Sequence, residues 1–205
     1  MNTAGKISMV GSLAIQHNKT GVRPDRGYML RNRIRPGFWW GELTVGLAKA
    51  LTALTGIPTI TGELRAVLNR KDGTKLDLGV LSRRVVTTAF VSFVVDQLQT
   101  ETSVFGDFKY HDSGVGTTAE AIGDTAMETT DGESRVAGTQ TESAADSYRS
   151  VGTIPYTTTK AITEHGVFND LTAGTLMDRS KFAAVNVVSG DSITWTYTIQ
   201  FAAGG

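Results

Sequence analysis

The stretch SGDSITWTYTIQF (189–201) limits most strongly what this chain can fold into. Apolar side chains alternate in it with Ser, Thr and Gln, which is typical of a β-strand with one buried face and one open face. Burying the apolar set contributes on the order of 8–15 kcal/mol, so we expect a core strand. Ser189 and Gly190 indicate a turn, which predicts pairing with the run just before it, 175–188. The apolar set is Ile193, Trp195, Tyr197, Ile199 and Phe201.

Other patterns predict that the rest of the domain is also mainly β. Asp72 and Gly73 form a turn pair between two alternating apolar runs, so 63–81 is expected to be a hairpin. The polar stretch 131–148 is expected to be a long surface excursion. Because the second half is rich in Thr and Gly, we expect an antiparallel β-sandwich with one or two short helices and an extended N-terminal arm.

Two segments have helical spacing. Phe90, Val94 and Leu98 recur at steps of four, which predicts a helix from about Thr88 with Thr87 or Thr88 as its N-cap. A second short helix is expected over 41–56, ended by Gly56. Its apolar face would consist of Leu43, Leu47, Leu51 and Leu54.

The first 40 residues have the composition of an extended arm. The stretch 17–37 is basic and is interrupted by Pro24 and Pro36, each of which disfavours helix in the preceding residue. Three large aromatic residues follow and need burial against a partner. We expect an arm over 1–40 and a β-rich globular domain over 41–205, with an alternative sub-boundary near residue 100. The residues predicted to bind a partner are Arg23, Arg26, Arg31, Arg33, Arg35, Phe38, Trp39 and Trp40.

Charge divides the 205-residue chain into two unlike halves. Residues 1–100 hold 14 Lys and Arg against 6 Asp and Glu, whereas residues 101–205 hold 6 against 14. Two interpretations stay open: opposite charges meet between neighbouring molecules, or they intermix on one folded surface. The arm arginines favour a protein partner over nucleic acid, because the whole chain is neutral and contains no motif that reads nucleic acid.

The sequence does not indicate catalysis or a cofactor. With no cysteine, the chain has no disulfide, thiolate nucleophile or Cys-ligated metal. His111 and His165 each stand beside an acid but lack metal-ligand spacing, so we interpret them as structural. The run GVGTTAEAIG (114–123) lacks the Lys of a phosphate loop, and the acids Glu120 and Asp124 show no sign of a cleft. We expect neither enzymatic activity nor a cofactor.

The sequence also predicts where the protein is made. It contains no apolar core of a signal peptide and no apolar run of membrane-spanning length. We therefore expect synthesis in a cytoplasm and no membrane partner.

Four stretches of the chain resemble virion proteins of tailed bacteriophages. The resemblance covers about the last 125 residues, and the first 80 resemble no family that we can name. It implies a structural component of the virion, made in the host cytoplasm, that contacts other virion proteins and copies of itself. The stretches are LGVLSRRVVTTAFVSFVVD (78–96), FKYHDSGVGTTAEAIGDTAM (108–127), ITEHGVFN (162–169) and GTLMDRSKFAAVNVVSGDSITWTYTIQFAAGG (174–205).

Within such a particle, the preferred role is a capsid decoration or cement protein. Its β domain would sit on the head shell, and its arm would contact the major capsid protein and tie neighbouring subunits together. The alternative is a tail, neck, baseplate or fibre-attachment protein, and copy number separates the two. A further alternative is a carbohydrate-binding module in which Trp195, Tyr156 and Tyr148 stack on sugars, although Trp195 falls on the apolar face of its strand. A hydrolase of surface polymers ranks last, because the sequence contains no paired-carboxylate signature.

Overall fold

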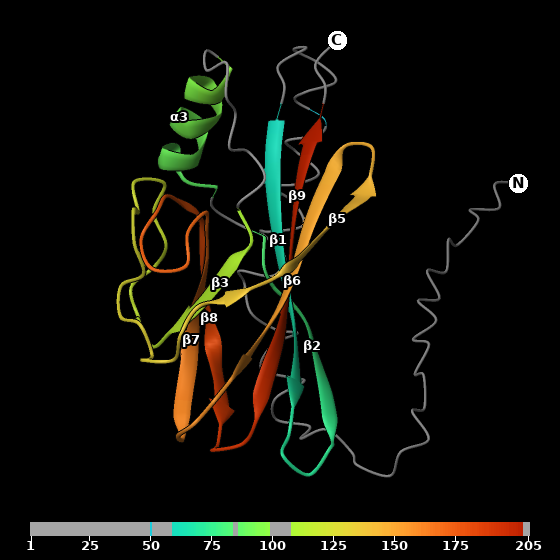
Figure 1. Ribbon diagram of the computed structural model, residues 1–205, viewed down its shortest axis with the longest axis vertical. Coiled ribbons are helices and arrows are strands. Elements are labelled where there is room, and N and C mark those ends of the chain that lie inside the picture. The colour runs from blue at the N-terminus through green and yellow to red at the C-terminus, as the bar shows by residue number, and fades with distance from the viewer. Residues whose placement is uncertain (1–49, 51–58, 84–85, 99–107, 203–205) are drawn as a thin grey trace, which may run out of the picture.

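Two antiparallel sheets form a β-sandwich in the computed structural model, which describes residues 50, 59–83, 86–98 and 108–202 (Figure 1). The strand order is β2-β1-β9-β6-β5 in one sheet and β4-β3-β7-β8 in the other. The predicted mainly β fold with some helix is confirmed. The elements are β1 (Thr59–Asn69), β2 (Lys75–Ser82), α3 (Thr88–Gln97), β3 (Tyr110–Gly114), β4 (Val136–Ala137), β5 (Thr139–Ala144), β6 (Ser147–Pro155), β7 (Lys160–Phe168), β8 (Leu176–Val187) and β9 (Ser192–Ala202).

The first hairpin and the helix follow local sequence signals. β1 and β2 pair antiparallel, and Gly73 in their turn has a φ of +87°, which glycine adopts without strain. α3 begins after Thr87, whose side-chain oxygen accepts a hydrogen bond from the Phe90 backbone N–H at 3.2 Å. Both predictions are confirmed, with Thr87 as the N-cap. Within the described ranges, no helix has the length and apolarity needed to cross a membrane.

β9 does not pair with the run before it, and this prediction was wrong. β9 lies between β1 and β6, whereas β8 pairs with β7 in the opposite sheet. The turn at 188–191 therefore carries the chain from one sheet to the other. Asp191 fixes this crossing: its carboxylate accepts hydrogen bonds from the N–H groups of Val188 and Lys71 at 3.0 Å each, and pairs with Arg70 at 2.7 Å. A turn signal alone does not distinguish a hairpin from a crossing between sheets.

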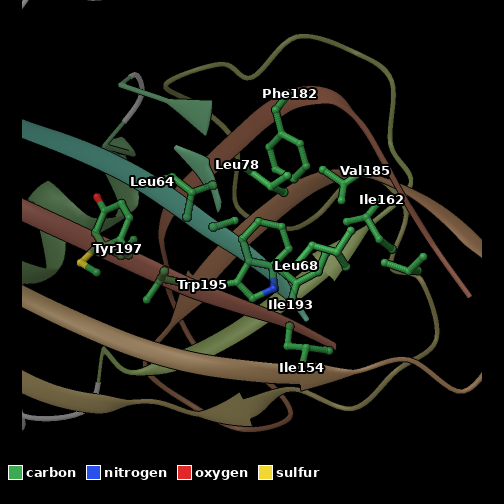
Figure 2. Packing of buried hydrophobic residues seen from close by; sticks show 14 of the residues in the cluster. Leu64, Leu68, Leu78, Ile154, Ile162, Phe182, Val185, Ile193, Trp195 and Tyr197 are labelled. Atoms are coloured by element: carbon green, nitrogen blue, oxygen red, sulfur yellow. The ribbon is translucent and has the colours of Figure 1, made fainter. Parts of the chain in front are cut away.

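Trp195 on β9 fills the middle of the core, and its neighbours on both flanking strands are small. Ala66 on β1 and Gly152 on β6 stand opposite it. From the facing sheet, the ring of His165 lies 4.6 Å from the indole and the ring of Phe182 lies 5.5 Å from it, centroid to centroid. Aliphatic side chains from both sheets surround these rings (Figure 2). The fully buried indole thus occupies a slot that the two small residues leave open.

The alternation of β9 buries four of its five apolar residues. Ile193, Trp195, Tyr197 and Ile199 are at most 1% exposed, whereas Phe201 is 40% exposed. Phe201 stands one residue before the end of the strand, and its cross-strand partner Ile60 is itself only partly buried. The predicted burial of Phe201 was therefore wrong, because the alternation continues past the part of the strand that the other sheet covers.

The polar stretch 131–148 lies on the surface as expected, but it contains strands. β4 pairs with β3, and β5 pairs with β6 and forms one edge of the five-stranded sheet. Five of the six residues of β5 are exposed. An edge strand with both faces open has no apolar alternation, so periodicity does not reveal it.

Strands from both sides of residue 100 belong to one sheet. β1 and β2 precede that point, and their neighbour β9 follows it. A division of the chain near residue 100 would therefore separate hydrogen-bonded strands. The predicted arm (1–40) lies outside the described residues. So does the predicted helix over 41–56, except for Ala50, which is helical.

Replacing Trp195 by Asp should prevent folding. The carboxylate would be buried without a partner in the space of the indole, at a cost comparable to the roughly 5–15 kcal/mol that stabilise a typical domain. Thr196→Asp places the same charge one residue away on the open face of β9, and we expect it to keep the fold and an unfolding midpoint near that of the wild type. Near-UV circular dichroism and thermal unfolding compare the two. A soluble Trp195→Asp protein that unfolds cooperatively would contradict the assigned core.

Candidate functional site

The residues predicted to bind a partner lie outside the part of the chain that the structure describes. They are the arginines and aromatic residues of the arm, Arg23, Arg26, Arg31, Arg33, Arg35, Phe38, Trp39 and Trp40. The described domain contains the other candidates from the sequence: two histidines, the glycine-rich run, the acids and the aromatic rings. Several of these meet in buried polar networks.

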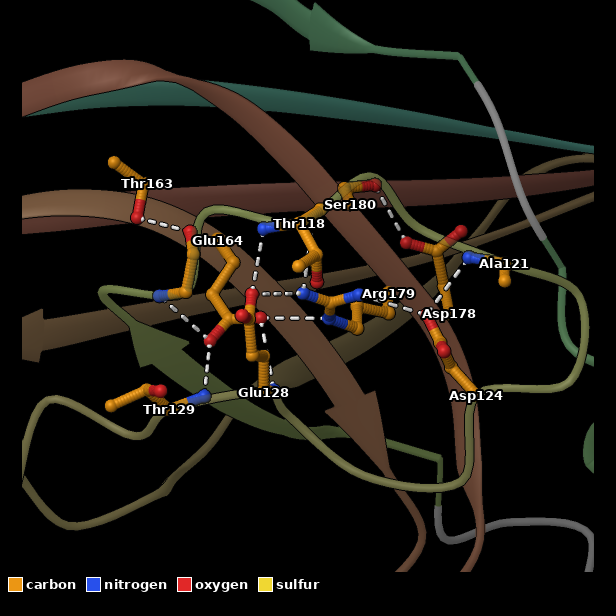
Figure 3. A network of polar contacts seen from close by, with 11 residues as sticks. Thr118, Ala121, Asp124, Glu128, Thr129, Thr163, Glu164, Asp178, Arg179 and Ser180 are labelled. Atoms are coloured by element: carbon orange, nitrogen blue, oxygen red, sulfur yellow. Dashed lines mark hydrogen bonds and ion pairs between the residues drawn. The ribbon is translucent and has the colours of Figure 1, made fainter.

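Glu164 on β7 is a buried carboxylate that binds the backbone of a distant loop. Its Oε1 accepts hydrogen bonds from the N–H groups of Gly116 (3.1 Å) and Thr129 (2.8 Å), and its Oε2 accepts one from that of Glu128 (3.2 Å). The next residue, His165, points into the core, so Glu164 points to the outer face of its sheet. The loop between β3 and β4 therefore lies over that outer face (Figure 3).

Arg179 on β8 binds acidic side chains of the same loop. Its guanidinium pairs with Glu164 at 2.7 Å, with Asp124 at 2.9 Å and with Glu128 at 3.2 Å. The Arg179 side chain is 3% exposed and that of Glu164 is 0% exposed. Such a buried pair is tolerated where further hydrogen bonds satisfy both groups, as they do here. We call Glu164, Arg179 and the loop atoms that they bind the loop clamp.

The loop clamp explains the glycine-rich run 114–123. A phosphate loop presents free backbone N–H groups to an anion, but here the Gly116 N–H already donates to Glu164. A Cβ at Gly116 would lie 2.5 Å from Oε1 of Glu164, so the close approach requires glycine. Asp124, one of the two acids considered for acid–base chemistry, pairs with Arg179 and accepts from the Ala121 N–H. The run is therefore a structural loop whose backbone N–H binds a carboxylate of the protein itself.

Arg135 fastens a second loop, 169–175, to the same sheet. Its Nε pairs with Asp112 at 3.0 Å, and its Nη1 donates to the carbonyl oxygens of Asp170 (3.0 Å) and Ala173 (2.6 Å). The guanidinium carbon lies 3.4 Å from the ring centroid of Phe168, a cation–π contact. Burial raises the pKa of the Asp112 carboxyl, while Arg135 acts in the opposite direction.

His111 and His165 meet in the core between the sheets. Nδ1 of His111 lies 3.0 Å from Nε2 of His165, and Nε2 of His111 lies 2.9 Å from Oγ of Ser150. Both rings are fully buried. Their structural interpretation fits these contacts, and among the described residues no group of three or more His, Asp or Glu is placed to hold a metal ion.

The contacts of the two imidazoles favour one neutral arrangement. Within the described residues, Nδ1 of His165 has no hydrogen-bond partner. If Nε2 of His165 donates to His111, and Nε2 of His111 donates to Ser150, no buried N–H is left without an acceptor. Burial lowers the pKa of His111 to about 4 and the pKa of His165 well below its usual value, with His111 adding to the second effect. Protonating His111 would place its Nδ1–H against the Nε2–H of His165, and protonating His165 would leave its Nδ1–H without an acceptor.

Asp178 on β8 is another buried titratable group. Ser180 donates to its Oδ1 at 2.8 Å, and the Tyr197 hydroxyl lies beside the carboxyl. Burial raises the pKa of Asp178 to about 7, although the bond from Ser180 acts in the opposite direction. Its contribution to stability is therefore present at low pH and is lost as the pH rises from about 4, the usual Asp value, to about 7.

None of the three aromatic rings considered for sugar stacking is fully exposed to solvent. Trp195 and Tyr156 are 0% and 2% exposed. Tyr148 is half-buried, and its hydroxyl donates to the Phe108 carbonyl oxygen at 2.5 Å. The first two rings pack in the core, and the third is hydrogen-bonded to the backbone.

Sequence reasoning missed the buried charges that organise the loops. Glu164 and Arg179 each stand in a strand among buried residues, and charged residues at such positions are normally paired. The position of a charged residue inside a buried strand was therefore the sequence signal that could have predicted a buried ion pair. Their partners were not predictable, because they come from loop backbone far away in the sequence.

Two surface features of the described domain have no role in these networks. The first is an apolar stripe on α3 and its C-cap, formed by Val91, Val95 and the C-cap residue Leu98. The second is a groove of about 460 Å³ beside the turn between β5 and β6, lined by Glu142, Ala144, Ala145, Asp146, Ser147, Tyr148 and Phe201.

No protein-family model matches the chain, and neither does any curated protein sequence.

Replacing Glu164 by Gln should destabilise the protein by about 3–5 kcal/mol, the usual cost of breaking a buried ion pair. The amide would turn an NH2 group toward N–H donors and leave Arg179 without its closest partner. We expect a lower midpoint in urea and faster cleavage by protease within 115–130. The control is Glu142→Gln, on an exposed edge strand, which should change neither quantity. Equal midpoints for the two variants would contradict the loop clamp.

The two buried histidines should remain neutral in acid. In NMR titrations, we expect the ring C–H resonances of His111 and His165 to stay constant from pH 7.5 to about 5.5. In urea-unfolded protein, the same residues should titrate near pH 6.5. Because the pKa is lower in the folded state, their stability contribution is complete above about pH 6.5 and is lost as the pH falls toward about 4. Titration of both rings near 6.5 in folded protein would contradict their burial.

Proposed function

We propose that this protein is a structural component of a bacteriophage virion, and that it decorates the head shell as a cement protein. It acts by binding, without catalysis or a cofactor. The sandwich sits on the shell, while the basic arm contacts the major capsid protein or a neighbouring copy of the same chain. The arm arginines pair with carboxylates, and the aromatic residues after them fill a pocket of the partner.

The observation that carries this proposal is that the stretches resembling virion proteins meet in one structural unit. Glu164 lies in ITEHGVFN, Arg179 lies in GTLMDRSKF, and the loop that both residues bind begins in FKYHDSGVGTTAEAIGDTAM. The resemblance therefore concerns residues that build the loop clamp. A loop held by buried charges keeps its shape, which suits a protein that makes many identical contacts around symmetry axes.

Charge supports a contact between the arm and an acidic protein surface. Residues 1–40 contain seven basic residues and one acid. The described residues of the domain contain 16 acids and 11 basic residues. Opposite net charges in the two parts favour binding of the arm to the domain of another copy, or to a shell protein of similar charge.

A tail, neck, baseplate or fibre-attachment protein is the second candidate, because the same resemblance and charge separation would serve a ring at the neck or tail. Copy number separates the two: hundreds of copies per particle favour decoration, whereas about three to twelve favour a tail or neck ring. A carbohydrate-binding module has less support, because Trp195 and Tyr156 are buried.

Neutralising the arm should weaken binding to expanded phage heads by at least about tenfold at low salt, because charge-assisted contacts would be lost. The test variant is the full-length chain with Gln at five positions, Arg23, Arg26, Arg31, Arg33 and Arg35. A control variant removes two positive charges from the folded domain instead, through Lys71→Gln and Lys75→Gln in the β1–β2 hairpin. Co-sedimentation with heads measures affinity, and quantitative gels measure copies per head.

The result sought is reduced binding of the arm variant with unchanged binding of the control. Deletion of residues 1–40 should reduce binding further. If the truncated protein (41–205) bound heads as tightly as the full chain, the arm would not be the tie between subunits. If neither form bound heads but both bound tails or necks, the second candidate would replace the first.

A further inference from the structure

α3 carries more apolar surface than the sandwich covers. Phe90 and Phe93 pack edge-on against Phe108, with ring centroids 5.0 and 4.9 Å apart, and Val94 packs on the same core. A second set of apolar residues follows at spacings of four and three and faces away from the core. This exposed stripe consists of Val91 (44% exposed), Val95 (50%) and Leu98 (80%).

The exposed stripe adjoins the buried face around the helix. At 3.6 residues per turn, Leu98 lies next to Val94 around the helix axis, and Val91 lies next to Leu98 on the far side from Val94. Thr88, Ser92 and Asp96 lie on the remaining side, whereas the half-buried Gln97 lies on the side of Phe90 and Phe93, in the last position of the helix. A surface helix that packs on one side alone usually has a narrower apolar stripe, so this width indicates a second element against α3.

The segment 41–56 has the matching pattern. Its four leucines repeat at helical spacing, and Ala50, its one described residue, is helical and exposed. It ends at Gly56, three residues before β1 begins at Thr59. Since an extended residue spans at most about 3.6 Å, Gly56 must lie within about 11 Å of Thr59. The leucines are Leu43, Leu47, Leu51 and Leu54.

The start of β1 and the start of α3 lie at the same end of the sandwich (Figure 1). A Cβ at Gly62 on β1 would be 3.4 Å from Oδ2 of Asp178. Asp178 in turn forms a bridge with Val86, the residue before the N-cap of α3. The short link from Gly56 to Thr59 therefore keeps the segment 41–56 within reach of the exposed stripe.

We infer that the segment 41–56 is a helix that docks its leucine stripe on Val91, Val95 and Leu98 of the same chain. Tethering by a few residues gives an effective concentration in the millimolar range, so the contact forms within one molecule. A second copy bound through this stripe alone is disfavoured, because three side chains fall far short of the roughly 800 Å² per partner of a stable interface. The docked helix fixes where the basic arm leaves the domain. The inference stands independently of a role in a virion.

The absence of cysteine makes a crosslinking test clean. Three full-length variants pair Val95→Cys with Leu47→Cys, Leu51→Cys or Leu54→Cys, because the register between the stripes is open. One control pairs Val95→Cys with Thr52→Cys, on the opposite side of the predicted helix. The other pairs Leu51→Cys with Ser92→Cys, on the polar side of α3. Mild oxidation followed by peptide mass spectrometry measures the rate and location of each disulfide.

At least one stripe pair should form an intramolecular disulfide about tenfold faster than both controls, since a disulfide needs Cβ atoms about 3.5–4.5 Å apart. Equal rates for stripe pairs and controls would overturn the inference. Disulfides formed only between chains would assign the stripe to a second copy and would overturn it too.

A second measurement does not depend on register. Val95→Asp should increase amide hydrogen exchange across 41–56 in the full-length protein, because it places a charge in the apolar contact. Ser92→Asp adds the same charge on the polar side of α3 and should leave that exchange unchanged. Val95 is half exposed, so its substitution should spare the core, which near-UV circular dichroism verifies. Unchanged exchange in a folded Val95→Asp protein would overturn the inference.

Discussion

The sandwich depends on one indole ring that needs small residues on both neighbouring strands. Trp195 fits because Ala66 and Gly152 stand beside it. Gly152 leaves room for a second ring as well, since a Cβ there would lie 2.6 Å from the His111 ring. His111 then meets His165, and His165 lies against the indole. The two buried histidines are thus part of the same packing arrangement, and their neutrality is a condition for it.

Charged side chains outside the apolar core organise the outer face of the second sheet. Glu164 and Arg179 bind each other and fasten the loop after β3, while Arg135 fastens the loop after β7. Buried pairs contribute little net stability in general, and their better-supported use is to specify one arrangement among several. In this domain they select one conformation for long polar loops that have few apolar residues to hold them.

Sequence patterns predicted the fold class, the first hairpin, the helix and its N-cap, because each depends on neighbouring residues. The pairing of β9 was not predictable in this way: Ser189 and Gly190 give the same turn signal whether the chain turns back or crosses to the other sheet. The exposed strand β5 lacked any alternation. The loop clamp joins residues 48 positions apart, from Gly116 to Glu164, and only the folded chain reveals that contact.

The position of β9 between β1 and β6 has a consequence for synthesis on the ribosome. Leu68 pairs with Ile193, so β1 can pair with β9 only after the ribosome has made another 125 residues. Until residues 192–202 emerge, β1 and β6 each have an open edge, and Trp195 is missing from the core. Folding therefore finishes after nearly all of these 205 residues have been made, and pairing over such a distance is intrinsically slow. A nascent chain stalled before residue 190 would present two unpaired strands to chaperones and to other nascent chains.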